Sequence, residues 1–224
     1  PERREALMTD SQTPPPSGSL EDPATVRRFA RMSGRSMRFR TFHRLLHTLP
    51  TRGRCLDVGA GPGAVAVAVA EDHPDLEIVA LEPSTPMIEA GRRRVADRGL
   101  EGRIRFVRGA AEDTDLVRSL GPFELVYSTY TLHHFDDPGT AVRGLLDAVA
   151  PGGALFLYDL RPVAWLTWIP RSRGFLGAVR SSLRPTELRA LLNRIGARDA
   201  EVSTAPPFLL YAIVRKKPVD DRGS

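Results

Sequence analysis

Cysteine is almost absent from this chain of 224 residues. Cys55 is the only one, so no disulfide forms within the chain and no cysteine pair or thiolate cluster is available for redox or metal chemistry. No apolar run approaches the length needed to cross a bilayer, and no stretch near the N-terminus resembles a signal peptide. We therefore expect no membrane partner and a cytoplasmic location.

Lysine is nearly as scarce, and one long segment has no acidic residue. Lys216 and Lys217 are the only lysines, so arginine supplies nearly all of the positive charge behind the net charge of +5. Genomic base composition explains such a skew as well as a nucleic-acid partner does. The distribution is more informative, because no acid lies between Pro23 and Leu56, where there are nine arginines.

The remaining sequence predicts one α/β domain between two tails. Residues 1–20 are rich in proline and serine and are expected to form a disordered tail, and residues 218–224 a flexible one. Helical periodicity over residues 23–49, with a break near Ser33-Gly34, predicts two short lid helices within residues 21–50. Residues 51–217 then form the main domain, with residues 161–184 as a lid insertion.

Strand and helix patterns alternate regularly through that domain. Strands are expected at 54–58, 76–82, 104–108, 123–129 and 153–159, and helices at 63–72, 85–98, 112–120 and 138–149. A helix at 187–195 and two strands at 198–204 and 208–215 follow, joined too closely for a helical crossover. The pattern predicts a seven-stranded, Rossmann-like doubly wound sheet, with five parallel strands and a C-terminal antiparallel hairpin.

The first expected strand runs into a glycine loop, Cys55-Leu56-Asp57-Val58-Gly59-Ala60-Gly61-Pro62-Gly63. Glycines tolerate positive φ and let a ligand approach the backbone, while the first amides of the following helix attract negative groups. Asp57 is placed to meet an ammonium group, and Glu82, ending the second strand, to hold two ribose hydroxyls. The loop 109–113 borders the position expected for an adenine ring. A nucleoside carrying an amino acid satisfies all three features.

Over roughly residues 25–215 the chain resembles the class I S-adenosylmethionine-dependent methyltransferases. The motifs that carry the resemblance are 56–63, Ala80-Leu81-Glu82-Pro83, Phe123–Ser128 leading to Leu132-His133-His134-Phe135, and the turn Pro151-Gly152-Gly153. The resemblance implies S-adenosylmethionine as cofactor, S-adenosylhomocysteine as product, glycines around the methionine portion, and Glu82 on the ribose. The implied cofactor-binding residues are Asp57, Gly59, Ala60, Gly61, Gly63, Glu82, Pro83, Met87, Ala110, Ala111, Glu112 and Ser128.

The chain departs from the family at one position. Many relatives carry an acid where Ala110 stands, and that acid accepts a hydrogen bond from the adenine amine. Here Glu112 or Asp113 takes over that contact, or backbone and apolar contacts suffice.

A dehydrogenase is the competing interpretation, since Gly59-Ala60-Gly61-Pro62-Gly63-Ala64 also fits a loose dinucleotide pattern. A short-chain dehydrogenase needs a tyrosine four residues before a lysine, and neither lysine has one. A two-domain dehydrogenase needs more chain. The sequence therefore disfavours this class.

Catalytic candidates follow the fourth and fifth strands. His133, His134 and Asp159 are candidate bases or orienting groups, and Tyr130 is a candidate hydrogen-bond partner of the substrate or a pocket wall. The structural alternative is that the two histidines and Asp159 only cap and pack their loops. Histidines and acids in so short a loop are more typical of solvated turns than of a metal site, and no metal is expected.

Two segments are expected to cover the acceptor: the basic N-terminal helices, including Arg31, and the insertion with Arg161, Trp165 and Trp168. Together with Tyr130 they predict a small apolar or aromatic acceptor with a negative group held by arginine. The leading hypothesis is a small-molecule methyltransferase, with specialised metabolism as its suggested setting. There are two alternatives. One is an RNA methyltransferase, and the other is a fold relative that binds the cofactor without transferring methyl, such as a cyclase, lyase or regulatory module. The oligomeric state is left open.

Overall fold

A computed structural model of the chain describes residues 22, 26–27, 30–31, 34–36, 39–162, 179, 181–206 and 208–218. The expected N-terminal tail at 1–20 lies outside these residues, as do residues 219–224. Most of the expected lid insertion, with Trp165 and Trp168, is also outside them.

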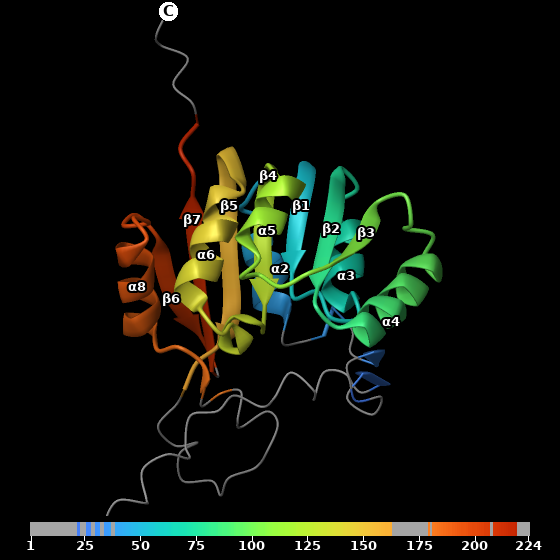
Figure 1. Cartoon of the computed structure of the whole chain (residues 1–224), viewed down its shortest axis with the longest axis horizontal. Coiled ribbons are helices and arrows are strands. Elements are labelled where there is room, and N and C mark those ends of the chain that lie inside the picture. Colours follow the sequence, from blue (N-terminus) through green and yellow to red (C-terminus); the bar gives the residue numbers. More distant parts are fainter. Residues whose placement is uncertain are drawn as a thin grey trace, which may run out of the picture.

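Seven strands form one sheet, in the order β3-β2-β1-β4-β5-β7-β6 (Figure 1). Their bounds are β1 Gly53–Val58, β2 Leu76–Glu82, β3 Ile104–Arg108, β4 Phe123–Thr129, β5 Val149–Leu160, β6 Glu201–Ala205 and β7 Leu209–Arg215. The first five strands pair in parallel, and β7 pairs antiparallel with both β5 and β6. The expected fold class is confirmed.

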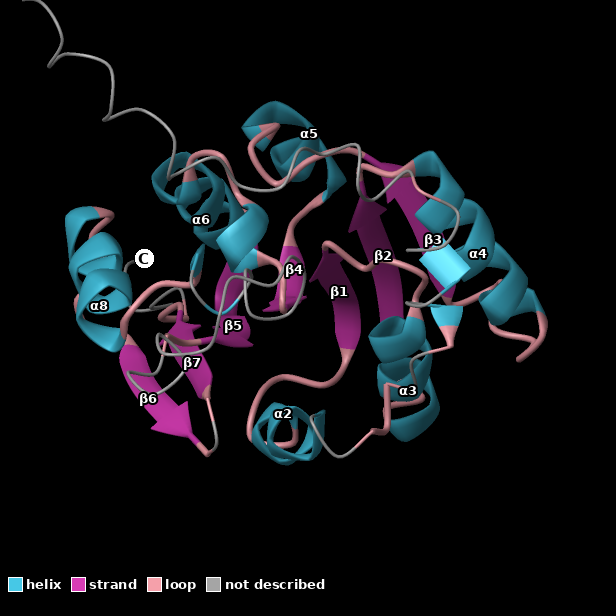
Figure 2. Cartoon of the chain, turned by 90° about the horizontal axis from the view of Figure 1, so that it is seen from below, coloured by secondary structure: helices cyan, strands magenta, loops and turns pink. Residues whose placement is uncertain are grey.

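Helices cover both faces of the sheet (Figure 2). The helices are α2 Arg40–Leu46, α3 Ala64–Asp72, α4 Thr85–Ala96, α5 Thr114–Leu120, α6 Pro138–Asp147 and α8 Pro185–Arg194, with a 3₁₀ turn η3 at Leu132–His134. One core contains the apolar side chains of α2, α3 and α4, and the other those of α5, α6 and α8. No helix in the described part of the chain is both long and apolar enough to span a bilayer.

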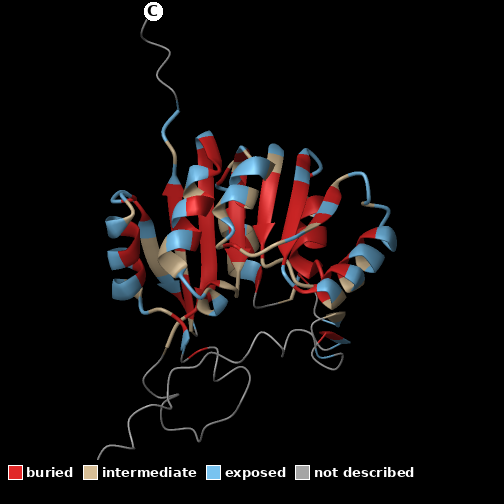
Figure 3. Cartoon of the chain, viewed as in Figure 1, coloured by how far each residue is buried: buried red, intermediate tan, exposed pale blue. Residues whose placement is uncertain are grey.

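Burial explains the strand compositions. The central strands are red along most of their length in Figure 3, because helices exclude water from both faces. In β2 every residue except Glu77 is buried, and the strand is a nearly continuous aliphatic run that ends in Glu82. Such runs are typical of parallel strands inside an α/β sheet.

β5 differs from the expected strand, whereas the N-terminal segment is described only in part. Within residues 23–49 the structure shows α2, which meets the second expected helix, and helical backbone at 26, 27 and 30. The other residues of the first expected helix lie largely outside the described ones, so that helix stays a prediction. β5 begins at Val149 rather than 153, so the expected turn 151–153 lies inside the strand. The pairing with β4 shifts register there, between Phe123 and Leu125, and Gly152 has a φ of 79°. A glycine turn can thus be absorbed into a strand as an irregularity.

Candidate cofactor and acceptor site

The glycine loop joins β1 to α3 at the edge where the parallel strands end. Gly59, Gly61 and Gly63 have φ angles of 69°, 53° and 69°, a region that glycine enters without steric cost. The Gly59 and Ala60 amides donate to the Leu81 carbonyl at 2.9 and 3.1 Å, and the Gly63 amide donates to the Ala60 carbonyl at 3.0 Å. The loop is therefore tied to β2 at its start and closed at its end, where Gly63 is the N-cap of α3.

The three glycines have different surroundings. A Cβ atom at Gly59 would lie 2.2 Å from Cγ2 of Thr131, and one at Gly63 would lie 3.0 Å from Cζ of Phe106. A Cβ atom at Gly61 would have no heavy atom within 4 Å. Packing thus requires a small residue at Gly59 and crowds Gly63, whereas Gly61 faces open space, where a ligand can approach the backbone.

Asp57, near the end of β1, is buried, and neither of its carboxylate oxygens has a hydrogen-bond partner. Burial, with a smaller contribution from the charge of Glu82, raises the pKa of Asp57 to about 7. The hydroxyl of Tyr127, from the paired position on β4, opposes this shift, although no hydrogen bond of good geometry joins the two groups. An unpartnered buried carboxylate is costly unless a cation or donor joins it, so this position suits an ammonium group.

Glu82 ends β2 and is also buried. Its Oε2 accepts from the Gly61 amide at 2.8 Å and its Oε1 accepts from the Ser84 amide at 3.0 Å. Ser84 is the N-cap of α4, and its side chain accepts from the amide of the buried Met87. Pro83, between Glu82 and Ser84, is exposed. A carboxylate has about four acceptor sites, so these two bonds alone do not saturate Glu82.

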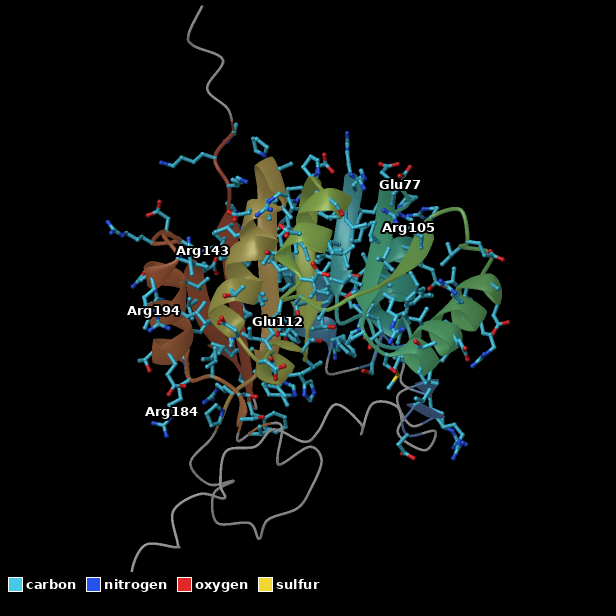
Figure 4. The ribbon with its side chains drawn as sticks, viewed as in Figure 1. Glu77, Arg105, Glu112, Arg143, Arg184 and Arg194 are labelled. Carbon is cyan, nitrogen blue, oxygen red and sulfur yellow. The ribbon has the colours of Figure 1, made fainter. Side chains whose placement is uncertain are left out.

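The loop after β3 carries the residues expected near adenine. Ala111 is buried and Ala110 is half-buried. Oε1 of Glu112 accepts from the Asp136 amide at 2.9 Å, so this side chain joins two loops, and Asp113 is the N-cap of α5. In Figure 4 Glu112 lies toward the edge at which the parallel strands end. Neither acid is free of a structural role, and the adenine contact stays a prediction.

The end of β4 contributes Ser128 and Tyr130. Ser128 is buried and its hydroxyl has no hydrogen-bond partner. Tyr130 has a φ of 55°, unusual for a residue other than glycine, and its amide donates to the Tyr158 carbonyl at 2.8 Å. Its ring contacts those of Phe39 and Tyr158 edge-on, at 5.3 and 5.6 Å between centroids. Such backbone strain persists where the surroundings hold it, and it is frequent at functional sites.

His133 and Asp159 form a buried pair between η3 and the end of β5. Their side chains are only 4% and 5% exposed, and Nδ1 of His133 lies 2.8 Å from Oδ1 of Asp159. Asp159 also accepts from the His133 amide at 3.0 Å and from its neighbour Leu160. Because an ionised carboxylate only accepts, it fixes the proton on Nδ1 and leaves Nε2 as the acceptor of a neutral imidazole.

His134 stands beside this pair without joining it. Its ring centroid lies 4.1 Å from that of His133, and the residue is exposed. Partial burial of the ring, followed by the charge of His133, lowers the pKa of His134 to about 4, against the opposing effect of Asp159. Solvent at the exposed edge reduces this effect, but His134 is neutral at neutral pH.

The expected acceptor residues are less fully placed. Arg161 directly follows β5, its amide donates to the Phe208 carbonyl at 2.9 Å, and its buried Nε has no hydrogen-bond partner. Arg31 is exposed. Trp165 and Trp168 lie outside the described residues, so the expected aromatic cover stays a prediction.

Sequence reasoning missed two residues of the loop's support. The Thr131 hydroxyl donates to the carbonyls of Gly59 at 3.4 Å and Thr129 at 3.0 Å, so it joins the loop after β4 to the first glycine. Arg94 on α4 donates from Nη1 to the Pro62 carbonyl at 2.7 Å. A threonine and an arginine carry no motif, so only their contacts reveal these roles.

The described residues fit an S-adenosyl cofactor. Asp57 offers an unpartnered buried carboxylate, Gly61 an open approach, Glu82 a carboxylate bonded to the loop at Gly61, and Ser128 an unpartnered buried hydroxyl. When bound, the cofactor supplies an electrophilic methyl group. Within the described ranges no group of three or more His, Cys, Asp or Glu side chains is placed to hold a metal ion.

Comparison with known proteins agrees with this geometry. Residues 55–153 match the family described as "Methyltransferase domain". Release factor glutamine methyltransferase of Neisseria gonorrhoeae is 44% identical over 72 residues, 32% of this chain and 26% of that protein. Ribosomal RNA small subunit methyltransferase C of Escherichia coli is 27% identical over 157 residues, 67% of this chain and 44% of that protein. The chain thus spans less than half the length of these curated relatives.

A solved structure from Methanococcus maripaludis, named as an S-adenosyl-L-methionine-dependent methyltransferase, superimposes with a TM-score of 0.70 at 19% identity. The match covers 94% of this chain and 97% of that one, and at this identity it shows a shared fold. The sequence match is confined to residues 55–153, and the superposition extends the likeness in fold to nearly the whole chain. The chain thus contains a region, residues 55–153, that matches the methyltransferase-domain family, and it shares the fold of a solved S-adenosylmethionine-dependent methyltransferase.

Proposed function

We propose that the chain transfers the methyl group of S-adenosylmethionine to a small molecule whose nucleophile carries a proton. The observation that carries this proposal is the buried pair of His133 and Asp159. The loop after β4 that carries His133 also contains Thr131, which packs on Gly59, the first glycine of the cofactor loop. Methyl transfer is an in-line displacement that depends mainly on orientation and exclusion of water, and a protonated nucleophile also requires a base.

His133 is the base of this proposal. Asp159 holds the proton on Nδ1, so Nε2 is the nitrogen that would take a proton from the acceptor and leave an imidazolium beside a carboxylate. Tyr130 is proposed as a wall or hydrogen-bond partner of the acceptor. Arg161 is proposed to hold its anionic group, because its Nε is buried without a partner at the end of β5.

RNA is the second candidate acceptor, and a specific observation favours it. Among the described residues of the acid-free N-terminal segment, six arginines are exposed: Arg27, Arg31, Arg35, Arg40, Arg44 and Arg52. The Escherichia coli relative is named as a ribosomal RNA methyltransferase, but the shared region is 44% of its length. Against RNA, Ser128-Thr129-Tyr130-Thr131 lacks the Asn/Asp-Pro-Pro-aromatic signature of base-amine methylation.

The test measures transfer of labelled methyl from S-adenosylmethionine to a panel of small phenols, hydroxy acids and carboxylic acids, with protein-free ribosomal RNA in parallel. We expect small molecules to be labelled, and His133→Asn to lower kcat by about a hundredfold or more with cofactor affinity preserved. His134→Asn, on the exposed neighbour, is the matched comparison and is expected to lower kcat less. Labelling of RNA alone would support the second candidate, and cofactor binding without transfer to either class would support a non-transferring relative.

A further inference from the structure

Arg94, on α4, contacts both the glycine loop and the N-terminal segment of the chain. Its Nη1 donates to the Pro62 carbonyl at 2.7 Å, and its Nη2 donates to the Ala30 carbonyl. Burial, followed by the charge of Arg98, lowers the pKa of Arg94. The guanidinium is partly buried, and it donates to two carbonyl oxygens. Such hydrogen bonds are charge-assisted and are stronger than those between neutral groups.

The Pro62 carbonyl belongs to the peptide group that closes the loop. The amide of that same peptide group, on Gly63, donates to the Ala60 carbonyl at 3.0 Å. Arg94 thus holds one end of the peptide plane and Ala60 the other. The orientation of this plane sets Gly63 as the N-cap of α3 and leaves the neighbouring Gly61 open to a ligand.

Close packing brings α4 within reach of the loop. A Cβ atom at Gly91 would lie 2.2 Å from Cζ of Phe106, and the same Cζ lies 3.0 Å from the Cβ position of Gly63. Gly63 and Gly91 therefore both lie against one ring, and Arg94 follows Gly91 by one helical turn. Its side chain can reach Pro62 only because this approach is so close.

The other partner of Arg94 belongs to an N-terminal strap, defined here as the described residues 30–31 and 34–36. Gly34 lies against the start of α3, where its Cβ would be 2.0 Å from the Ala64 carbonyl oxygen. The Gly34 carbonyl lies 2.9 Å from Nε2 of His43, and Arg35 pairs with Asp72 at 2.7 Å. The strap is thus attached to α2, to both ends of α3, and through Arg94 to α4.

We infer that Arg94 is a positioning residue that couples the N-terminal strap to the cofactor loop. Because one guanidinium holds both carbonyls, displacement of the strap releases Pro62, and a ligand that orders the loop orders the strap. Such coupling is reciprocal: whatever the strap adds to cofactor affinity, the cofactor adds to strap stability. The inference uses the proposed function only in taking S-adenosylhomocysteine as the ligand.

The test compares the wild-type chain with Arg94→Gln, Arg94→Lys and, as the matched control, Arg93→Gln, which changes an exposed arginine on the same helix. Calorimetry gives the affinity for S-adenosylhomocysteine, and hydrogen exchange of residues 30–36 is followed with and without this ligand. We expect Arg94→Gln to weaken affinity about tenfold, to speed exchange of the strap, and to abolish its protection by the ligand. Lysine, which reaches one carbonyl at a time, should give an intermediate affinity, and Arg93→Gln should match wild type.

Gly34→Ala is a second, independent variant, because it displaces the strap from Ala64 while Arg94 is retained; it too should lower the affinity. Unchanged affinity and unchanged exchange in both Arg94→Gln and Gly34→Ala would overturn the inference, as would an equal loss in Arg93→Gln. If the wild-type chain does not bind S-adenosylhomocysteine, the proposed function fails. In that case equal strap exchange in wild type and the Arg94 variants, without ligand, would overturn the inference as well.

Discussion

At the residue scale, the ionisation state of Asp57 should depend on the bound ligand. With a pKa of about 7 in the folded chain, its carboxylate is half protonated near neutrality when nothing compensates its burial. A cofactor ammonium requires the ionised form, so a proton competes with the ligand. We expect affinity for S-adenosylhomocysteine to fall as pH is lowered from about 8 to about 6, and Asp57→Asn to bind weakly with little pH dependence over this range. Calorimetric titrations at each pH measure both.

The same shift predicts the opposite effect on stability. The folded state keeps the Asp57 proton up to about pH 7, whereas the ordinary value is 3.8. The folded chain therefore binds more protons than the unfolded chain between these values, and its stability falls as pH rises through this window. Asp57→Asn should lose that fall and be more stable than wild type above about pH 7, as urea unfolding would show. A variant that is both less stable and still pH-dependent would contradict this account.

Some residues of the site can be recognised from the sequence, and others only from the structure. Asp57 and Glu82 stand at strand ends beside the glycine loop, so their proximity follows from the sheet topology. Thr131 and Arg94 act through backbone carbonyls, and any residue offers a carbonyl. No pattern of side chains could have indicated them.

At the scale of the element, the glycine loop is held by packing at one glycine and open at another. We expect Gly59→Ala to lower the free energy of unfolding by about 2–4 kcal/mol, because its Cβ meets Thr131 and its φ is positive. Gly61→Ala meets no atom, so only the backbone strain of about 1–2 kcal/mol remains. Urea unfolding of the two variants measures the difference.

The two variants should also differ in their affinity for the ligand, because only Gly61 lies where the ligand approaches the backbone. Gly61→Ala places a methyl group where the ligand approaches, so it should weaken S-adenosylhomocysteine binding more than its small stability loss accounts for. Equal stability losses in the two variants, or unchanged ligand affinity in Gly61→Ala, would show that the loop is not arranged in this way.

α2 shows how tertiary packing decides an element. It has seven residues and no side-chain cap, so its sequence alone specifies it weakly. Phe42 stacks on Phe156 at 5.1 Å with an interplanar angle of 4°, and its ring also contacts Tyr127 and Tyr158 edge-on. This fully buried ring holds the helix on the sheet. The periodicity of the N-terminal segment predicted helix there but not its bounds.

At the scale of the whole molecule, the sheet order sets where the chain opens first. All strands except the edge strands β3 and β6 are paired on both sides, and β1, β4 and β5 are the three at the centre of the sheet. In β6 only Ala205 is buried. We expect amides of β1, β4 and β5 to exchange most slowly and those of β6 fastest among the strands, because edge amides reach solvent by local opening. Hydrogen exchange by mass spectrometry tests this, and a β6 as protected as β4 would contradict it.

The sequence by itself determined the sheet, the glycine loop and the acids beside it, because alternation of strands and helices fixes a parallel sheet and its strand ends meet at one edge. Tertiary structure decided the rest. Only the folded chain brings His133 to Asp159 across 26 residues, sets Thr131 against Gly59, and joins Ala30 to Pro62 through Arg94. These contacts depend on side-chain directions and backbone carbonyls, which no local pattern encodes.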